Sequence, residues 1–118
     1  MAFFEKVLKR SDGNIDIDEF LNNLDVEEEN AYEDVDAFVK PVALQTERDR
    51  DLVIDELKKG NLVLLNISDL SKRNAIKLKD LIGGIKQTAD DIDGDIARIT
   101  SDYVLITPAK VKIIKRKA

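Results

Sequence analysis

The sequence predicts an α/β fold, a compact βαβα unit followed by antiparallel strands. Short apolar runs of strand length alternate with longer segments whose apolar residues recur every three or four positions. Turn residues, such as Gly60 and the pair Asp93-Gly94, separate these segments. The predicted domain covers residues 39–118, and we expect an amphipathic helix at 1–10 and a flexible acidic linker at 11–38 to precede it.

Residues 39–67 are predicted to form a strand, a helix and a second strand. The first strand is VKPVALQ (39–45), in which Pro41 is tolerable if the strand lies at an edge of the sheet. NLVLLNI (61–67) is a nearly continuous apolar run, which is typical of a strand buried on both faces. A strand, helix, strand order at this spacing implies a right-handed crossover and parallel pairing of the two strands.

The helix between these strands is predicted to begin after Thr46 and to end at Gly60. Thr46 is a favourable N-cap with Asp49 three residues later, and glycine is common just after the end of a helix. The residues predicted to face inward are Leu52, Val53, Ile54 and Leu57.

A second helix is predicted after SDLS (68–71), with one apolar stripe that contains Ala75, Leu78, Ile82 and Ile85. Gly83-Gly84 lies late in this stripe, and each glycine costs about 1 kcal/mol of helix propensity relative to alanine. Two interpretations stay open: the helix ends here, or the missing side chains let another helix approach closely, as at a dimer interface. The predicted interface residues are Leu78, Ile82, Gly83, Gly84 and Ile85.

Three strands are predicted to follow the turn at Asp93-Gly94. They are DIARIT (95–100), YVLIT (103–107) and VKIIK (111–115), which are rich in β-branched residues. The first two would be joined through Ser101-Asp102 and would pair in antiparallel fashion.

The net charge of −5 conceals three blocks of different charge. The side chains of residues 1–10 sum to +2, residues 11–39 contain eleven acidic residues and no basic one, and residues 40–118 sum to +4. A high charge with sparse apolar residues is typical of a disordered segment, so the middle block is predicted to be a tether. A helical turn within residues 18–24 is the alternative for part of it.

Residues 1–10, MAFFEKVLKR, are predicted to form a helix that lies on an anionic membrane surface. At 100° per residue the apolar side chains fall on one arc and the charged side chains on the opposite arc. Docking of this helix on the protein's own core is the alternative, but the acidic tether weakens it. The predicted membrane-binding residues are Phe3, Phe4, Lys6, Val7, Leu8, Lys9 and Arg10.

The composition argues against several classes of function. Cys and His are both absent, which removes disulfides, the common zinc sites and nucleophiles activated by histidine. No calcium loop fits, because placing Gly94 at the sixth position puts Ala89 first and Thr100 last, where Asp and Glu are required. We therefore expect no catalytic residue, no metal and no cofactor. No apolar run is long enough for a membrane span or a signal peptide, so we expect a cytoplasmic protein.

The domain carries a series of motifs: VALQ, GNLVLLNISDL, a helix ending in LIGG, DGDIARI and YVLITP. In this combination they resemble the SepF family of cell-division proteins, in its archaeal form. The resemblance covers roughly residues 39–115 by motif and residues 1–10 by type. The combination of G-x-x-V-x-x-N, D-G-x-I-x-R-I and a strand ending in Thr-Pro is more specific than any of these motifs alone.

The resemblance implies a two-layer sandwich for the fold. It also implies a non-enzymatic adaptor that anchors the tubulin-like GTPase FtsZ to the inner face of the cell membrane at the division site. In this family the domain forms a homodimer and binds the C-terminal tail of FtsZ. The basic residue of the D-G-x-I-x-[RK] strand, which helps to hold the tail, corresponds to Arg98. The residue that lines the same pocket from the next strand corresponds to Val104, with Tyr103 as its aromatic neighbour.

A nucleic-acid-binding module with an acidic regulatory linker is the alternative of a different class. It depends on the +4 domain and on four cations near the C-terminus that could contact phosphates: Lys112, Lys115, Arg116 and Lys117. Few aromatic residues are available for base stacking, and the acidic linker would compete with DNA for the same surface. We therefore expect no nucleic acid among the partners.

Overall fold

A computed structural model gives the fold of the protein and describes residues 16–25 and 32–116. The chain divides into two compact units, Met1–Asp34 and Val35–Ala118, and each is described by itself. The predicted membrane helix at 1–10, with Phe3, Phe4, Lys6, Val7, Leu8, Lys9 and Arg10, lies outside the described residues. No helix within 16–25 or 32–116 is long and apolar enough to cross a membrane.

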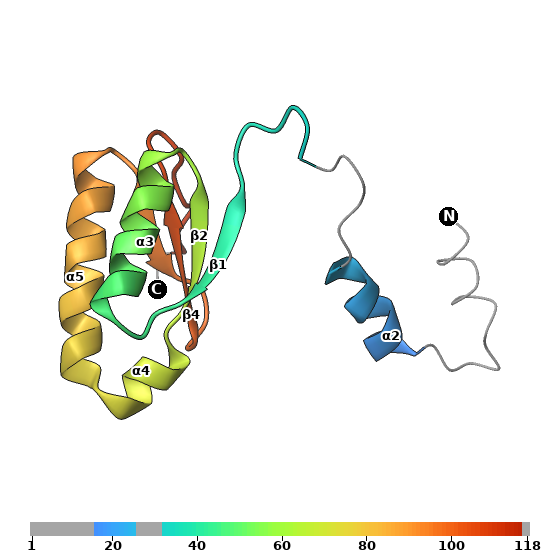
Figure 1. Cartoon of the computed structure of the whole chain (residues 1–118), viewed down its shortest axis with the longest axis horizontal. Helices are drawn as coiled ribbons and strands as arrows, with labels where there is room; N and C mark the ends of the chain where they lie inside the picture. Colours follow the sequence, from blue (N-terminus) through green and yellow to red (C-terminus); the bar gives the residue numbers. More distant parts are fainter. Residues whose placement is uncertain (1–15, 26–31, 117–118) are drawn as a thin grey trace. The chain divides into compact units, whose positions relative to one another are not determined.

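The second unit contains a four-stranded sheet in the order β1-β2-β4-β3 (Figure 1). The strands are β1 (Val39–Ala43), β2 (Leu62–Asn66), β3 (Asp95–Arg98) and β4 (Tyr103–Thr107). β1 pairs with β2 in parallel, as predicted, and β4 pairs antiparallel with both β2 and β3. Pro41 therefore lies on an edge strand, where its missing N–H costs no hydrogen bond of the sheet's interior.

Helices cover one face of this sheet. They are α3 (Glu47–Lys58), α4 (Ser68–Arg73) and α5 (Ala75–Asp91), and α3 and α5 pack side by side (Figure 1). The two-layer α/β sandwich predicted from the sequence is thus confirmed. Its core consists of Val42, Leu44, Val53, Leu57, Val63, Leu65, Ile67, Leu70, Leu81, Ile85, Ala89, Val104 and Ile106.

α3 begins and ends close to the predicted residues. The carboxylate of Asp49 accepts a hydrogen bond from the backbone N–H of Thr46 at 3.0 Å, which closes the first turn. Gly60 has a φ of 92°, a left-handed conformation that glycine adopts without strain after a helix end. The prediction that Leu52 faces inward was wrong, because Val53 and Leu57 form the buried stripe and Leu52 is 41% exposed on the neighbouring arc.

The helix predicted after SDLS (68–71) is α5, but SDLS itself lies in a separate helix, α4, and Asn74 separates the two. Asn74 has a φ of −157°, and its side-chain oxygen accepts a hydrogen bond from the backbone N–H of Lys77 at 3.0 Å. It therefore caps the N-terminus of α5. The signal for this break, an asparagine before a run of helix-forming residues, is present in the sequence.

α5 continues through Gly83-Gly84 to Asp91, so the interpretation that the helix ends at the glycines was wrong. Leu81 and Ile85 are completely buried on either side of the pair, and their burial outweighs the propensity cost of two glycines. A Cβ at position 84 would lie 3.3 Å from Cδ of Arg50, which belongs to α3. The helix that lies close to Gly84 is thus α3 of the same domain.

Two predictions about the sheet were also wrong. β2 is not buried on both faces, because the helices cover one face only and Leu62 and Leu64 are half-buried on the other. The predicted strand VKIIK does not form within the described residues. The backbone N–H of Ile113 donates to the carboxylate of Asp95 at 2.9 Å, so it is not available to the backbone carbonyl of a neighbouring strand.

The described part of the first unit contains the short helix α2 (Ile17–Asn22) and the 3-10 turn η1 (Asn23–Asp25). The side chain of Asp16 caps α2 by accepting a hydrogen bond from the backbone N–H of Glu19 at 3.0 Å. The structure therefore shows the helical turn that was the alternative prediction for this part of the acidic segment.

Candidate peptide-binding cleft

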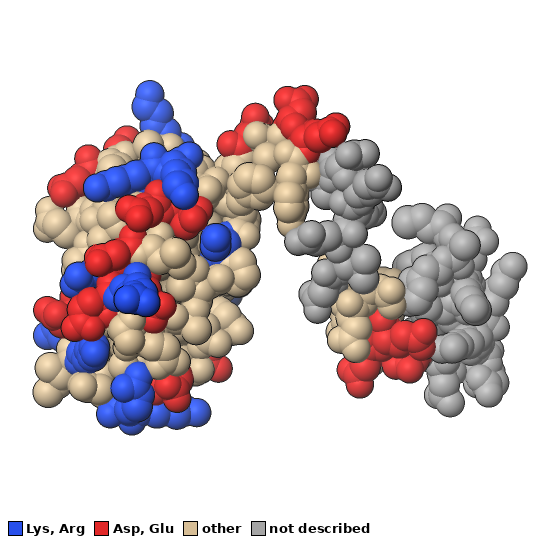
Figure 2. All heavy atoms as spheres, viewed as in Figure 1, with Lys and Arg blue, Asp and Glu red and all other residues tan. Residues whose placement is uncertain are grey.

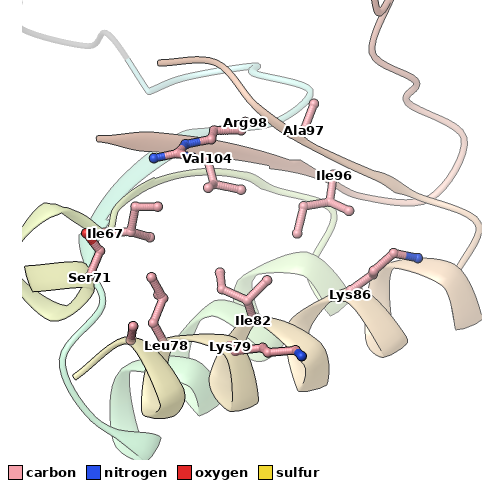
Figure 3. Close-up of a pocket in the computed structure, with 11 residues that line it drawn as sticks. Ile67, Ser71, Leu78, Lys79, Ile82, Lys86, Ile96, Ala97, Arg98 and Val104 are labelled. Carbon is pink, nitrogen blue, oxygen red and sulfur yellow. The ribbon is translucent and has the colours of Figure 1, made fainter. Parts of the chain in front are cut away.

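A cleft of about 480 Å³ lies between α5 and the sheet edge formed by β3 and β4 (Figure 3). Its volume falls in the range of typical ligand sites. The apolar lining residues come from three directions: the segment after β2, helix α5 and the strands. They are Ile67, Ala75, Leu78, Ile82, Ile96, Ala97 and Val104.

The alternation of side chains along the strands builds one wall of this cleft. Arg98 is paired with Val104, and Ile96 with Ile106, so these side chains lie on the helix-covered face of the sheet. Leu78 and Ile82 are four residues apart and share one face of α5, opposite this wall. Both pack against the core and leave part of their surface to the cleft.

The rim of the cleft is positively charged. Lys79, Lys86 and Arg98 are among the lining residues, and none of the lining residues is acidic. Lys86 forms an ion pair with Asp90 at 3.0 Å. Within residues 16–25 and 32–116, neither Lys79 nor Arg98 has a carboxylate partner, so their charges remain available to a ligand.

Arg98 is held in place by the turn between β3 and β4. Its guanidinium donates to the carbonyl of Ser101 at 2.6 Å and to the carbonyl of Thr100 at 3.2 Å. These bonds fix the position of the side chain but do not neutralise its charge. An apolar floor beside positioned cations fits a peptide that combines apolar side chains with carboxylates.

The structure separates the three residues predicted to bind the tail. Arg98 and Val104 line the cleft together (Figure 3). Tyr103 lies next to Val104 in the strand, so its side chain points to the opposite face of the sheet, where it is 37% exposed. Tyr103 is therefore not among the residues that line the cleft, and its role in tail binding stays a prediction.

Several lining residues were not predicted as parts of this site. Ile96 lies two positions before Arg98, and strand periodicity would have placed it on the same face. Lys86 lies four residues after Ile82, and this spacing places it on the same side of α5. Leu78 and Ile82, which were predicted at a dimer interface, also line the cleft.

Of the remaining residues of the predicted dimer interface, Gly83 and Gly84 line one hollow on α5, whereas Ile85 does not. Ile85 has no exposed area and belongs to the chain's own core, so its assignment to an interface is corrected. Gly84 lies beneath Arg50 of α3. Gly83 faces open space, beside the highly exposed Ile76.

Two of the four cations named for the nucleic-acid alternative are engaged within the domain. Lys112 pairs with Asp93 at 2.8 Å, and Lys115 pairs with Asp95 at 2.6 Å. Lys117 lies outside the described residues. The positive charge that this segment offers to phosphates is therefore smaller than the sequence indicates.

Comparison with known proteins identifies the family of this domain. The family model "Cell division protein SepF" matches residues 39–113, which include the whole sheet and the helices on it. The chain belongs to the SepF family.

A SepF from Bifidobacterium animalis subsp. lactis is 34% identical over 70 residues, covering 59% of this chain and 43% of the relative. A SepF from Haloferax volcanii is 30% identical over 63 residues, covering 53% of this chain and 52% of the relative. The chain thus spans about half the length of these relatives.

Solved structures of SepF proteins share the fold. A SepF-like protein from Pyrococcus furiosus is 31% identical with a TM-score of 0.62, covering 75% of this chain and 100% of that chain. A SepF-like protein from Archaeoglobus fulgidus is 25% identical with a TM-score of 0.63, covering 69% of this chain and 96% of that chain. A SepF from Methanobrevibacter smithii, solved in complex with FtsZ-CTD, is 21% identical with a TM-score of 0.59. The likeness covers 67% of this chain and 99% of that chain. At this last identity the likeness concerns the fold alone.

Proposed function

We propose that the cleft binds the C-terminal tail of FtsZ. The observation that carries this proposal is the apolar floor of the cleft beside the positioned, unneutralised guanidinium of Arg98. Such a site suits a short peptide with apolar and acidic side chains. A SepF of the same fold has been solved with FtsZ-CTD, which makes this tail the first ligand to test.

In this proposal the protein acts as an adaptor and not as an enzyme. The domain holds the FtsZ tail, and residues 1–10 attach the chain to the inner, cytoplasmic face of the membrane at the division site. The separation of apolar from basic side chains in MAFFEKVLKR supports this role, because interfacial helices require both.

We further propose that the protein forms a homodimer through the face of the sheet that the described helices leave uncovered. Register places Pro41, Leu64, Leu105 and Ala97 in one apolar row across all four strands on this face. An apolar sheet face normally packs against a second layer. A second copy of the chain would supply that layer.

Reversing the charge at Arg98 tests the tail-binding proposal. In the full chain, Arg98→Glu is expected to weaken binding of an FtsZ C-terminal peptide at least about tenfold, because the variant replaces an attractive charge with a repulsive one. Fluorescence anisotropy of a labelled peptide measures the affinity.

Arg48→Glu is the matched control. Arg48 is exposed on α3 and does not line the cleft, so this variant makes the same change of charge elsewhere and should bind as the wild type does. Circular dichroism shows whether each variant is folded. Equal affinity of the two variants for the peptide would remove Arg98, and with it the cleft, from the proposal.

A further inference from the structure

The acidic segment before the domain contains an exposed apolar stripe. Ile17, Leu21 and Leu24 are 55%, 47% and 68% exposed, and their spacing places them on one side of α2 and η1. α2 has no buried residue. A helix of six residues is too short to be stable in water by itself. Its apolar side therefore indicates a segment that docks on another surface.

The charge of this segment limits the kind of surface that it fits. Asp16, Asp18 and Glu19 lie in or beside the first turn of α2, and the chain contains no basic residue from 11 to 39. Figure 2 shows acidic side chains and no basic ones on the described residues of this part of the chain. A suitable surface is therefore apolar with a basic rim, and an anionic membrane is disfavoured.

The cleft of the same protein has this chemistry. Its floor is apolar, its rim carries Lys79, Lys86 and Arg98, and no acidic residue lines it. The cleft and the segment are thus complementary in both hydrophobicity and charge.

We propose that residues 16–25 are a ligand of the cleft and compete there with the FtsZ tail. The competition rests on the proposed function, but the docking does not. The segment makes the adaptor self-inhibiting, because an incoming tail must displace it. The protein then favours tails that are offered at high local concentration, as on a polymer, over single tails.

The length of chain between the segment and the domain permits this docking. Residues 26–34 connect the segment to the domain unit, which begins at Val35, and they can span at most about 32 Å when fully extended. The radius of gyration expected for a folded domain of this size is about 12 Å. A tether of this length gives an effective concentration on the order of millimolar, so even weak intrinsic affinity leads to substantial occupancy.

A spin label on α2 tests the docking without any FtsZ peptide. The chain has no cysteine, so Asn22→Cys provides a single attachment site, on an exposed residue outside the apolar stripe. In the full chain, the label is expected to broaden the amide signals of Ile82 and Arg98. Adding Leu21→Glu, which places a charge in the stripe, should abolish this broadening. Broadening that is absent, or unaffected by Leu21→Glu, overturns the docking.

The affinity for the FtsZ tail tests the competition. Leu21→Glu in the full chain is expected to bind a labelled tail peptide about two- to tenfold more tightly than the wild type, because the competing segment is released. Asn22→Glu adds the same charge outside the stripe and should leave the affinity unchanged. Unchanged affinity of Leu21→Glu overturns the competition.

The two measurements separate failure of this inference from failure of the proposed function. If the label broadens the cleft signals but no variant binds the tail peptide, the proposed function fails and the docking stands. If the peptide binds the cleft but the label has no effect there, tail binding stands and the docking fails.

Discussion

Gly94 lies where the chain enters β3, and it is packed directly against the end of β4. A Cβ at this position would lie 2.2 Å from the carbonyl oxygen of Thr107 and 3.1 Å from that of Pro108. Both atoms belong to the backbone, so the clash cannot be relieved by rotating a side chain. We expect Gly94→Ala to lower the free energy of unfolding by about 2 kcal/mol or more, as measured by urea denaturation.

Gly83→Ala is the matched control for this substitution. No atom lies within 4 Å of a Cβ at position 83, and the residue is inside α5. Alanine should therefore raise the free energy of unfolding by about 0.5–1 kcal/mol, because it restores helix propensity. A destabilised Gly83→Ala, or a neutral Gly94→Ala, would contradict the packing around these residues.

For single residues, the sequence predicts well which positions lie near the cleft. It predicts less well the face of the sheet to which each side chain points. Arg98 and Val104 were identified from the resemblance, and the structure places both at the cleft. Tyr103 was added as a neighbour in the sequence, although alternation along a strand sends adjacent side chains to opposite faces. The lysines from α5 were missed because their distance from Arg98 in the sequence hides their proximity in the fold.

Among the elements, the segment after β4 is held by carboxylates and by a few backbone carbonyls, and not by strand pairing. The carboxylate of Asp95 accepts hydrogen bonds from Lys115 at 2.6 Å and from the backbone N–H groups of Ile113 and Ile96, each at 2.9 Å. These partners, Lys115 first, hold the pKa of Asp95 well below its usual range. Lys112 likewise lowers the pKa of Asp93.

These lowered pKa values predict a dependence on pH. A carboxyl group with a lower pKa in the folded state stabilises it fully above the pKa of the unfolded chain, about 4, and this contribution is lost as the pH falls through the lowered value. We expect residues 111–116 to remain attached at neutral pH and to detach in acid. The chemical shift of the Ile113 amide, followed by NMR during an acid titration, measures this detachment.

Asp95→Asn tests the same attachment at neutral pH. The amide side chain loses the ion pair with Lys115, so exchange of the Ile113 amide proton should become several-fold faster. Asp55→Asn removes one negative charge from an exposed position on α3 and should leave this exchange unchanged. Equal exchange in the two variants would show that Asp95 does not hold the segment.

The order of the elements could be predicted from the sequence because most of them are encoded locally. The Thr46 and Asp49 cap, the glycine at 60 and the apolar run of β2 each act within a few residues. The errors arose where tertiary contacts decide. α5 continues through two glycines because Leu81 and Ile85 are buried in the core. VKIIK is not a strand because the N–H of Ile113 donates to the carboxylate of Asp95.

For the whole molecule, the proposed attachment to a membrane and the proposed dimerisation depend on each other. Burial of each apolar side chain of residues 1–10 contributes about 1.5–3 kcal/mol at most, and each basic residue near an anionic surface adds about 1 kcal/mol. Ordering ten residues costs about 1 kcal/mol or more for each of them. These contributions nearly cancel, so one helix should bind weakly, and two helices on a dimer should bind more tightly through their high effective concentration.

Charge substitutions on two different surfaces test where the interface of the proposed dimer lies. Leu64→Glu places a charge in the apolar row of the uncovered sheet face and is expected to give a monomer by analytical ultracentrifugation. Ile76→Glu places the same charge on the outer side of α5, where Ile76 is 85% exposed beside Gly83, and is expected to leave the dimer intact. The opposite result would place the interface on α5, near the glycines at which the sequence predicted it.

Co-sedimentation with anionic vesicles connects this interface to the membrane. Phe4→Glu is expected to abolish binding and to leave the proposed dimer intact, because it places a charge on the apolar side of the predicted helix without changing the domain. Leu64→Glu is expected to weaken binding at least about tenfold, although its residues 1–10 are unchanged, because each particle then carries one helix. If a monomeric Leu64→Glu bound vesicles as tightly as the wild type, one helix would suffice, and the membrane would not require a dimer.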